Sequence, residues 1–359
     1  MNDPGSNVAR HLRIAATDRP DGLATKSPVG VNPTGEVRHA VRTFRQLDQE
    51  SDSAAGYFAA AGIAAGARVL LAVRPGHDLI VGMFGLLKLG AVPVAIDPGM
   101  GWSAFLDCVR RSRPTALVGV RTATLLSRLP FAAFHSLHHR VTVGSSAWRQ
   151  ALTATSPTQR AAGQGRPRHA RSHPLHVWVN RRTQGVCYTH GMFDAQIELV
   201  RKTYAISPGE TDMAMLPLFV ALFTSGPRHD HGHAAPLTVK PLAADPAPLV
   251  AALIAEKVTS SFGSPAIWSK VADHCEARGL KLPDLRRLLI AGAPVSGELL
   301  AQLRIIAPHC VTHTPYGATE CLPVTTITAD ELLGEARQLA LRGQGTCVGR
   351  PVSGVEIRV

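Results

Sequence analysis

Apolar runs of two different lengths alternate along the first third of the chain, and this alternation constrains the fold more than any other feature. Short aliphatic runs with the pattern of buried strands occupy 68–73, 91–96 and 115–120. Longer segments with helical spacing occupy 44–62, 77–90 and 102–113. The first helix opens with a capping-box pair, Thr43 and Gln46. Strands that are apolar on both faces and separated by helices predict a parallel α/β sheet with right-handed crossovers.

The same alternation returns in the second half of the chain. Helices are predicted at 193–204, 248–256, 266–278 and 297–306, and strands at 258–262 and 285–291. The chain is 45% hydrophobic and 18% charged, which is enough apolar material for a sizeable core. Two stretches lack any period, and we expect 157–184 and 224–240 to be irregular.

Positive charge is concentrated in one of these stretches. The net charge is +12, and a basic chain raises the question of a nucleic-acid partner. Residues 157–185 contain no acid and six arginines: Arg160, Arg166, Arg168, Arg171, Arg181 and Arg182. Because half of the excess comes from this short stretch, we expect no nucleic-acid partner. Binding with a steep salt dependence would be required to restore that hypothesis.

The cellular compartment is predicted from the cysteine pattern and from the absence of a membrane span and a secretory signal in the sequence. Its six cysteines are widely scattered without a C-x-x-C pair, which favours free thiols. The apolar run 79–87 meets Lys88 well before the roughly 20 residues that a membrane span needs. Residues 1–30 show no secretory signal. We therefore expect a cytoplasmic protein without a transmembrane segment.

Two short motifs suggest a nucleotide site. The turn 291–295 (AGAPV) follows a predicted strand, and small residues there let a flat ring approach the backbone. In the second motif, 314–320 (TPYGATE), Tyr316 can cover such a ring, Thr319 offers a hydroxyl to phosphate, and Glu320 is a hard oxygen ligand for Mg²⁺. Either motif alone is also typical of a surface turn with a helix cap. Their combination favours the site.

In the order and spacing of these motifs, the chain resembles the adenylate-forming superfamily, which includes acyl-CoA synthetases, luciferases and peptide-synthetase adenylation domains. The resemblance extends from residue 7 to residue 359 and is strongest to the fatty-acyl-CoA ligase-like branch that includes olefin β-lactone synthetases. The phrases that carry it are TFRQLDQESDSAAGYFAAAGI (43–63), GMFGLLKLGAVPVAIDPGMG (82–101), GVCYTHGMF (185–193), FGSPAIW (262–268), AGAPV (291–295), TPYGATE (314–320) and GRPVSGVEIRV (349–359).

The resemblance implies a division of the chain and a set of roles. Residues 1–42 would form an N-terminal segment and 43–359 the large AMP-binding domain. The substrate would be a fatty or β-hydroxy acid, activated with ATP and Mg²⁺, with coenzyme A as a candidate acceptor. Gly263 would line the acyl pocket, and Phe219 is a candidate for its wall, although core packing is the simpler interpretation of Phe219. The implied nucleotide and metal residues are Gly292, Ala293, Pro294, Tyr316, Gly317, Thr319 (phosphate) and Glu320 (magnesium).

The chain departs from the family where a phosphate loop should precede GVCYTHG. The family has a Ser/Thr/Gly-rich loop ending in Pro-Lys-Gly, whose N–H groups and lysine hold the phosphates. Residues 177–184 (VWVNRRTQ) contain neither glycine nor lysine. One permitted choice of codons for 176–185 is CAC GTC TGG GTC AAC CGG CGC ACC CAA GGC, and its second frame reads Thr-Ser-Gly-Ser-Thr-Gly-Ala-Pro-Lys. We infer a frame slip that begins between about 150 and 166 and ends near Gly185.

A second slip is suggested at 228–232 (RHDHG), where a shifted frame permits Gly-Met-Thr-Thr-Val. The alternative is a metal site, because His229, His231 and His233 alternate and can share one face of an extended segment. No second ligand group accompanies them. A solvated or misframed loop is therefore the favoured interpretation.

The resemblance also implies a ribose-binding Asp and a lid domain with a catalytic Lys beyond residue 359, so we expect a protein without them. Two functions follow. The first is an adenylate-forming ligase by descent, impaired in this chain. The second is a non-catalytic remnant that retains weak nucleotide or acyl affinity.

Overall fold

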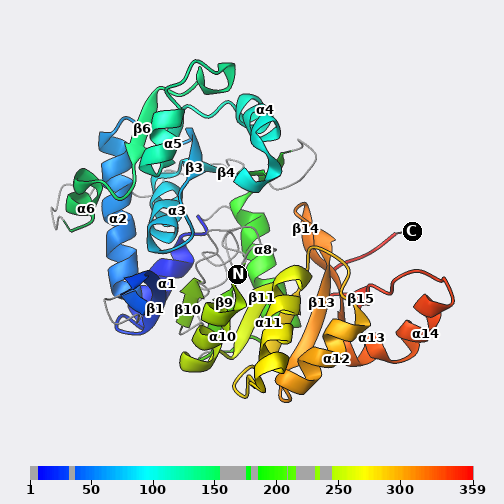
Figure 1. Cartoon of the computed structure of the whole chain (residues 1–359). Helices are drawn as coiled ribbons and strands as arrows, with labels where there is room; N and C mark the ends of the chain where they lie inside the picture. Colours follow the sequence, from blue (N-terminus) through cyan, green and yellow to red (C-terminus); the bar gives the residue numbers. More distant parts are fainter. Residues whose placement is uncertain are drawn as a thin grey trace. The chain divides into compact units, whose positions relative to one another are not determined.

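The computed structural model describes residues 7–31, 37–153, 175–178, 185–207, 209–215, 231–234 and 245–358. The chain folds into two compact units, and Figure 1 shows the elements of each. The first unit contains the described residues of 1–24 and 40–197. The second contains the described residues of 25–39 and nearly everything after residue 198.

The first unit is built on a six-stranded sheet in the order β6-β5-β3-β4-β7-β8. Its strands are β3 (Arg68–Ala72), β4 (Val92–Ile96), β5 (Ala116–Gly119), β6 (His139–Thr142), β7 (Leu175–Trp178) and β8 (Val186–Tyr188). All pairs are parallel except β7 with β8. Its helices include α1 (Arg10–Asp18), α2 (Phe44–Ala60), α3 (His77–Leu89), α4 (Trp102–Ser112), α5 (Arg121–Leu126) and α6 (Ser146–Thr153).

Local sequence explains these elements. The Thr43 side chain accepts a hydrogen bond from the backbone amide of Gln46, and the Gln46 side chain accepts one from the backbone amide of Thr43. The predicted capping box therefore begins α2. Gly90 ends α3 at a φ of +77°, a left-handed conformation that favours glycine. Every residue of β4 is buried, as expected of a strand covered on both faces.

The second unit holds a nine-stranded sheet in the order β15-β14-β13-β12-β11-β9-β10-β1-β2. Its strands are β1 (Leu23–Val31), β2 (Val37–Thr43), β9 (Thr211–Ala214), β10 (His231–Ala234), β11 (Ser260–Gly263), β12 (Arg287–Ile290), β13 (Val311–Ala318), β14 (Cys321–Thr328) and β15 (Arg350–Pro351). From β1 through β10, β9, β11 and β12 to β13 the pairing is parallel, and β14 and β15 add an antiparallel edge.

Helices cover one face of this sheet with an apolar core. They are α10 (Pro246–Ala255), α11 (Pro265–Arg278) and α12 (Gly297–Ile306), and α13 (Ala329–Leu333) and α14 (Glu335–Leu341) follow β14. Met213 of β9, Ile290 of β12 and Met215, which follows β9, pack in one cluster with Trp268 of α11, which is fully buried. A further helix, α8 (His190–Thr203), precedes β9 in the chain. The predicted parallel α/β architecture is therefore confirmed.

Within the stretches 157–184 and 224–240, for which we expect irregular structure, the described residues form β7 and β10. Strand β7 pairs with β4 and β8, and β10 pairs with β1 and β9. Backbone partners on both sides stabilise these strands although their sequences carry no periodic apolar face. The other residues of both stretches lie outside the described residues. Within the described part of the chain, no helix has the length and apolar character that a membrane crossing requires.

Candidate active site

The two motifs singled out in the sequence leave the nine-stranded sheet at the same edge. Strands β12 and β13 are parallel, with Leu289 paired to His313. Gly292 and Tyr316 each follow that pair by the same number of residues along their strands. The carboxyl ends of parallel strands form the edge where open α/β sheets bind ligands. The structure therefore brings the motifs to one edge of the second unit.

The turn after β12 exposes its backbone. Gly292 has a φ of +93°, and a Cβ added there would meet no atom within 4 Å. Ala293 and Pro294 are exposed. The turn ends where the Ser296 side chain accepts a hydrogen bond from the Leu299 amide, at 3.2 Å, and caps α12. A flat ligand can approach this turn without displacing a side chain.

The second motif forms a β-hairpin, which the sequence analysis did not predict (Figure 1, orange). Thr319 and Glu320 are its tip, because Ala318 pairs with Cys321. The register shifts between Tyr316 and Ala318, and a Cβ on Gly317 would overlap the Cys321 carbonyl oxygen. Gly317 is therefore required by the bulge itself. Tyr316 is 54% exposed, and Glu320 is also exposed at the tip.

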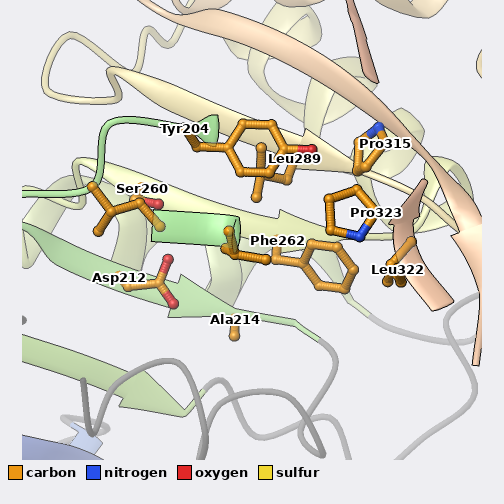
Figure 2. Close-up of a pocket in the computed structure, with 11 residues that line it drawn as sticks. Tyr204, Asp212, Ala214, Ser260, Phe262, Leu289, Pro315, Leu322 and Pro323 are labelled. Atoms are coloured by element: carbon orange, nitrogen blue, oxygen red, sulfur yellow. The ribbon is translucent and has the colours of Figure 1, made fainter. Parts of the chain in front are cut away.

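A largely apolar pocket lies on the opposite face of the sheet from α11, beside the end of α8 (Figure 2). The alternation of a strand places Asp212 and Ala214 of β9 on this face, and Ser260 and Phe262 of β11 join them. The whole lining is Val200, Tyr204, Ile206, Asp212, Ala214, Ser260, Phe262, Leu289, Pro315, Leu322 and Pro323. Figure 2 shows Asp212 and Ser260 toward one end of the pocket and Leu322, Pro315 and Pro323 toward the other.

Asp212 is the one acid in this lining. Burial raises its pKa from 3.8 to about 7 and outweighs two smaller effects that lower it. The Ser260 hydroxyl donates a hydrogen bond to the carboxylate, and the Arg287 guanidinium attracts it, so both lower the pKa, whereas Glu210 raises it. Near neutral pH the side chain is therefore a mixture of acid and carboxylate. In its protonated form it can both donate and accept a hydrogen bond.

Fixed polar groups surround that acid. Arg287 forms a two-point ion pair with Glu210, one N–O distance being 3.0 Å. Tyr204 donates its hydroxyl to Thr326 at 3.2 Å, and burial raises the pKa of Tyr204 to about 12. Its ring meets His313 edge-on, with centroids 5.1 Å apart. Because these partners are already engaged, they hold the pocket wall in one arrangement.

Of the two residues implied for an acyl pocket, the structure describes Gly263 but not Phe219. Gly263 does not line the pocket; a Cβ there would lie 2.8 Å from Nε1 of Trp268, in the core on the other face of the sheet. Its glycine is thus explained by packing. Phe219 and the phosphate-loop positions 179–184 lie outside the described residues.

The Gly263 contact makes a stability prediction. We expect Gly263→Ala to lower the free energy of unfolding by about 1–3 kcal/mol, because the methyl group overpacks against Trp268. The matched control is Gly82→Ala in α3, where the added Cβ stays 3.8 Å from Leu71. That change should be neutral or stabilising, since alanine favours a helix interior. Urea unfolding of both variants tests this, and equal midpoints would contradict it.

Asp212, Ser260 and Tyr204 were not predicted from the sequence. The available signal was Asp212 within the apolar run TDMAM (211–215). An acid on a buried strand needs partners, and a close reading of that pattern would have marked it. Tyr204 and Ser260 gave no such signal, because their roles depend on which strands become neighbours.

Comparison with known proteins assigns this α/β fold to a family. The family model described as AMP-binding enzyme matches residues 14–179 and 182–359. The chain belongs to the AMP-binding enzyme family. The match is interrupted at 180–181, within the segment where the sequence lacks the expected phosphate loop.

Individual relatives refine this assignment. The chain is 35% identical to an olefin β-lactone synthetase of Xanthomonas campestris pv. campestris, covering 98% of this chain and 64% of the relative. It is 35% identical to one of Stenotrophomonas maltophilia, covering 100% and 65%. It thus spans about two thirds of the length of these relatives. The solved Mycobacterium tuberculosis fatty acyl CoA synthetase superposes with a TM-score of 0.76 at 18% identity, over 97% of this chain and 65% of that one.

Proposed function

We propose that this chain is the nucleotide-binding part of an adenylate-forming ligase for a fatty or β-hydroxy acid. In that reaction a carboxylate oxygen attacks the α-phosphorus of ATP, an acyl–AMP bond forms, and pyrophosphate leaves with the electron pair of the broken P–O bond. The observation that carries the proposal is the meeting of the Gly292 turn and the 314–320 hairpin at one sheet edge. The olefin β-lactone synthetase relatives support the acid substrate.

Each motif residue has a role in this proposal. Adenine would lie on the open turn of Gly292, Ala293 and Pro294, with the exposed Tyr316 ring over it. Gly317 would keep the hairpin in register. The tip would meet the triphosphate, with the Thr319 hydroxyl toward a phosphate and the Glu320 carboxylate toward Mg²⁺.

Magnesium fits the exposed carboxylate of Glu320 but not a protein cage. Among the described residues, no three His, Cys, Asp or Glu side chains are grouped so as to hold a metal ion. Mg²⁺ commonly takes one or two carboxylates and completes its shell with phosphate oxygens and water. The bound ion would neutralise phosphate charge. Glu320 would therefore position it only together with the nucleotide.

The missing phosphate loop argues that this chain binds nucleotide without turning it over. Gln184 stands where the family has lysine, and 177–184 contain no glycine. Charge develops on the phosphates during the reaction, so loss of the loop affects catalysis more than ground-state binding. A non-catalytic remnant with weak nucleotide or acyl affinity is the second candidate function, and the same observation favours it.

Nucleotide binding tests the proposed site directly. We expect Tyr316→Ala to weaken ATP binding about tenfold, because ring stacking on a base contributes roughly 1–3 kcal/mol. Val311→Ala on the same strand, also exposed, is the control and should change nothing. Glu320→Gln should remove the dependence of affinity on Mg²⁺. Calorimetric titration of the full chain measures all three, and wild-type ATP affinity in Tyr316→Ala would reject the adenine site.

A further inference from the structure

The pocket on the α8 side of the nine-stranded sheet has two chemically different ends (Figure 2). Leu322, Pro315 and Pro323 line the end near the carboxyl edge, where the candidate nucleotide motifs lie. Asp212 and Ser260 line the other end and are paired across β9 and β11. Phe262 and Leu289 lie between them. An otherwise apolar site with one polar pair is suited to an apolar ligand that carries one hydrogen-bonding group.

The depth of the pocket follows from strand geometry. Asp212 precedes Ala214, the last residue of β9, by two positions, which corresponds to about 7 Å along the strand. A carboxylate held at the edge would therefore bring roughly the fifth or sixth carbon of its chain to Asp212. Beyond this point an apolar chain would have to pass a polar group. Burying such a group without a partner is unfavourable.

We infer that Asp212, supported by Ser260, is a specificity-determining residue that selects an acid with a hydroxyl group near the far end of a short chain. This inference rests on the proposed function, because it assumes that the acid's carboxylate lies at the nucleotide edge. The hydroxyl would exchange hydrogen bonds with the Asp212 carboxyl group. An unsubstituted chain of the same length would leave that group without a ligand partner.

The surroundings of Asp212 define how this preference depends on pH. The titratable and charged groups around it are Glu210 just before β9, Arg287 on β12 and Tyr204 just after α8. The Tyr204 ring in turn contacts His313 of β13. Ser260 is its neighbour on β11, and the residue beside it on β10 is glycine. Arg287 and Glu210 are paired with each other, and burial raises the pKa of the Asp212 carboxyl to about 7, so this carboxyl changes charge near neutrality. An alkyl terminus beside it should become less favourable as pH rises, while a hydroxyl remains a donor to the carboxylate.

The test is equilibrium binding of hexanoate and 6-hydroxyhexanoate to the full chain, measured by calorimetry at pH 6 and pH 8. Wild type should bind the hydroxy acid about fivefold or more tightly, the factor that one net hydrogen bond provides. Hexanoate affinity should fall between pH 6 and pH 8. Asp212→Leu should reverse the preference, and Asp212→Asn should keep it while losing its pH dependence. Asp273→Asn, an exposed acid on α11, is the matched control.

Two results separate this inference from the proposed function. Equal affinity for the two acids in wild type, or an unchanged ratio in both Asp212 variants, overturns the selective role of Asp212 and leaves the ligase proposal standing. Dodecanoate is included as a long-chain probe. If none of the three acids binds, the acyl site itself is wrong, and both proposals fall.

Discussion

Replacing residues 176–184 with Thr-Ser-Gly-Ser-Thr-Gly-Ala-Pro-Lys should raise fatty-acid-dependent exchange between pyrophosphate and ATP by at least about 100-fold, the usual effect of one preorganised donor to a developing charge. The native segment offers Gln184 in place of the lysine and no glycine among residues 177–184. A glycine-rich loop can turn several backbone N–H groups toward the phosphates, and the lysine adds a cation. Both act on the transition state, so the gain is expected in rate.

The matched control carries the same loop with its final lysine changed to alanine, and should lose most of the gain. All variants are measured both alone and fused to the C-terminal portion of an olefin β-lactone synthetase, so that the loop is the single difference within each set. Substantial exchange by the unmodified chain would contradict the prediction. It would mean that Arg181 and Arg182 have taken over phosphate binding.

Asp212→Asn should change how stability depends on pH. The native pKa of Asp212 is raised from 3.8 to about 7, so between these values the folded chain holds a proton that the unfolded chain releases. Wild-type stability therefore falls as pH rises from about 4 to 7, by as much as about 4 kcal/mol at 1.36 kcal/mol per unit. Access of water to the pocket reduces this figure. Asparagine does not ionise, and the variant should lack this share of the decline.

Urea midpoints of wild type, Asp212→Asn and Asp273→Asn at several pH values between 4 and 8 measure this effect. Each variant differs from wild type in one aspartate, so the effect of each substitution is the difference between its curve and the wild-type curve. The Asp273→Asn curve should follow wild type. Parallel curves for wild type and Asp212→Asn would show that the carboxyl group titrates normally.

Much of the fold was predictable because its signals are local. The Thr43–Gln46 capping box and the apolar period of α2 predicted a helix at 44–62, and the structure has Phe44–Ala60. The helix predicted at 297–306 is confirmed without change. The hydrophobic period and the end caps of a helix depend on residues that are close together in the sequence. They can therefore be recognised without knowing which elements the helix packs against.

The hairpin of β13 and β14 shows where local signals fail. Tyr316 to Glu320 contain no period, and their glycine and threonine are equally typical of a cap. The Gly317 bulge and the pairing with β12 place this segment at the carboxyl edge of the parallel strands, beside the Gly292 turn. Strands β7 and β10 were not predicted for the same reason, because their hydrogen-bond partners come from distant parts of the chain.

By itself the sequence determined the α/β class, the order of most elements and the two motifs for which nucleotide binding is proposed, because each depends on residues that are close together along the chain. It predicted a strand at 258–262, one residue short of Gly263, and could not assign a face of the sheet to Gly263. Tertiary structure alone decided that Gly263 packs on Trp268, and that Asp212 shares a pocket with Ser260 and Tyr204. Which side chains meet depends on strand order and on the two-residue alternation of each strand, and both are determined only when the sheet is assembled.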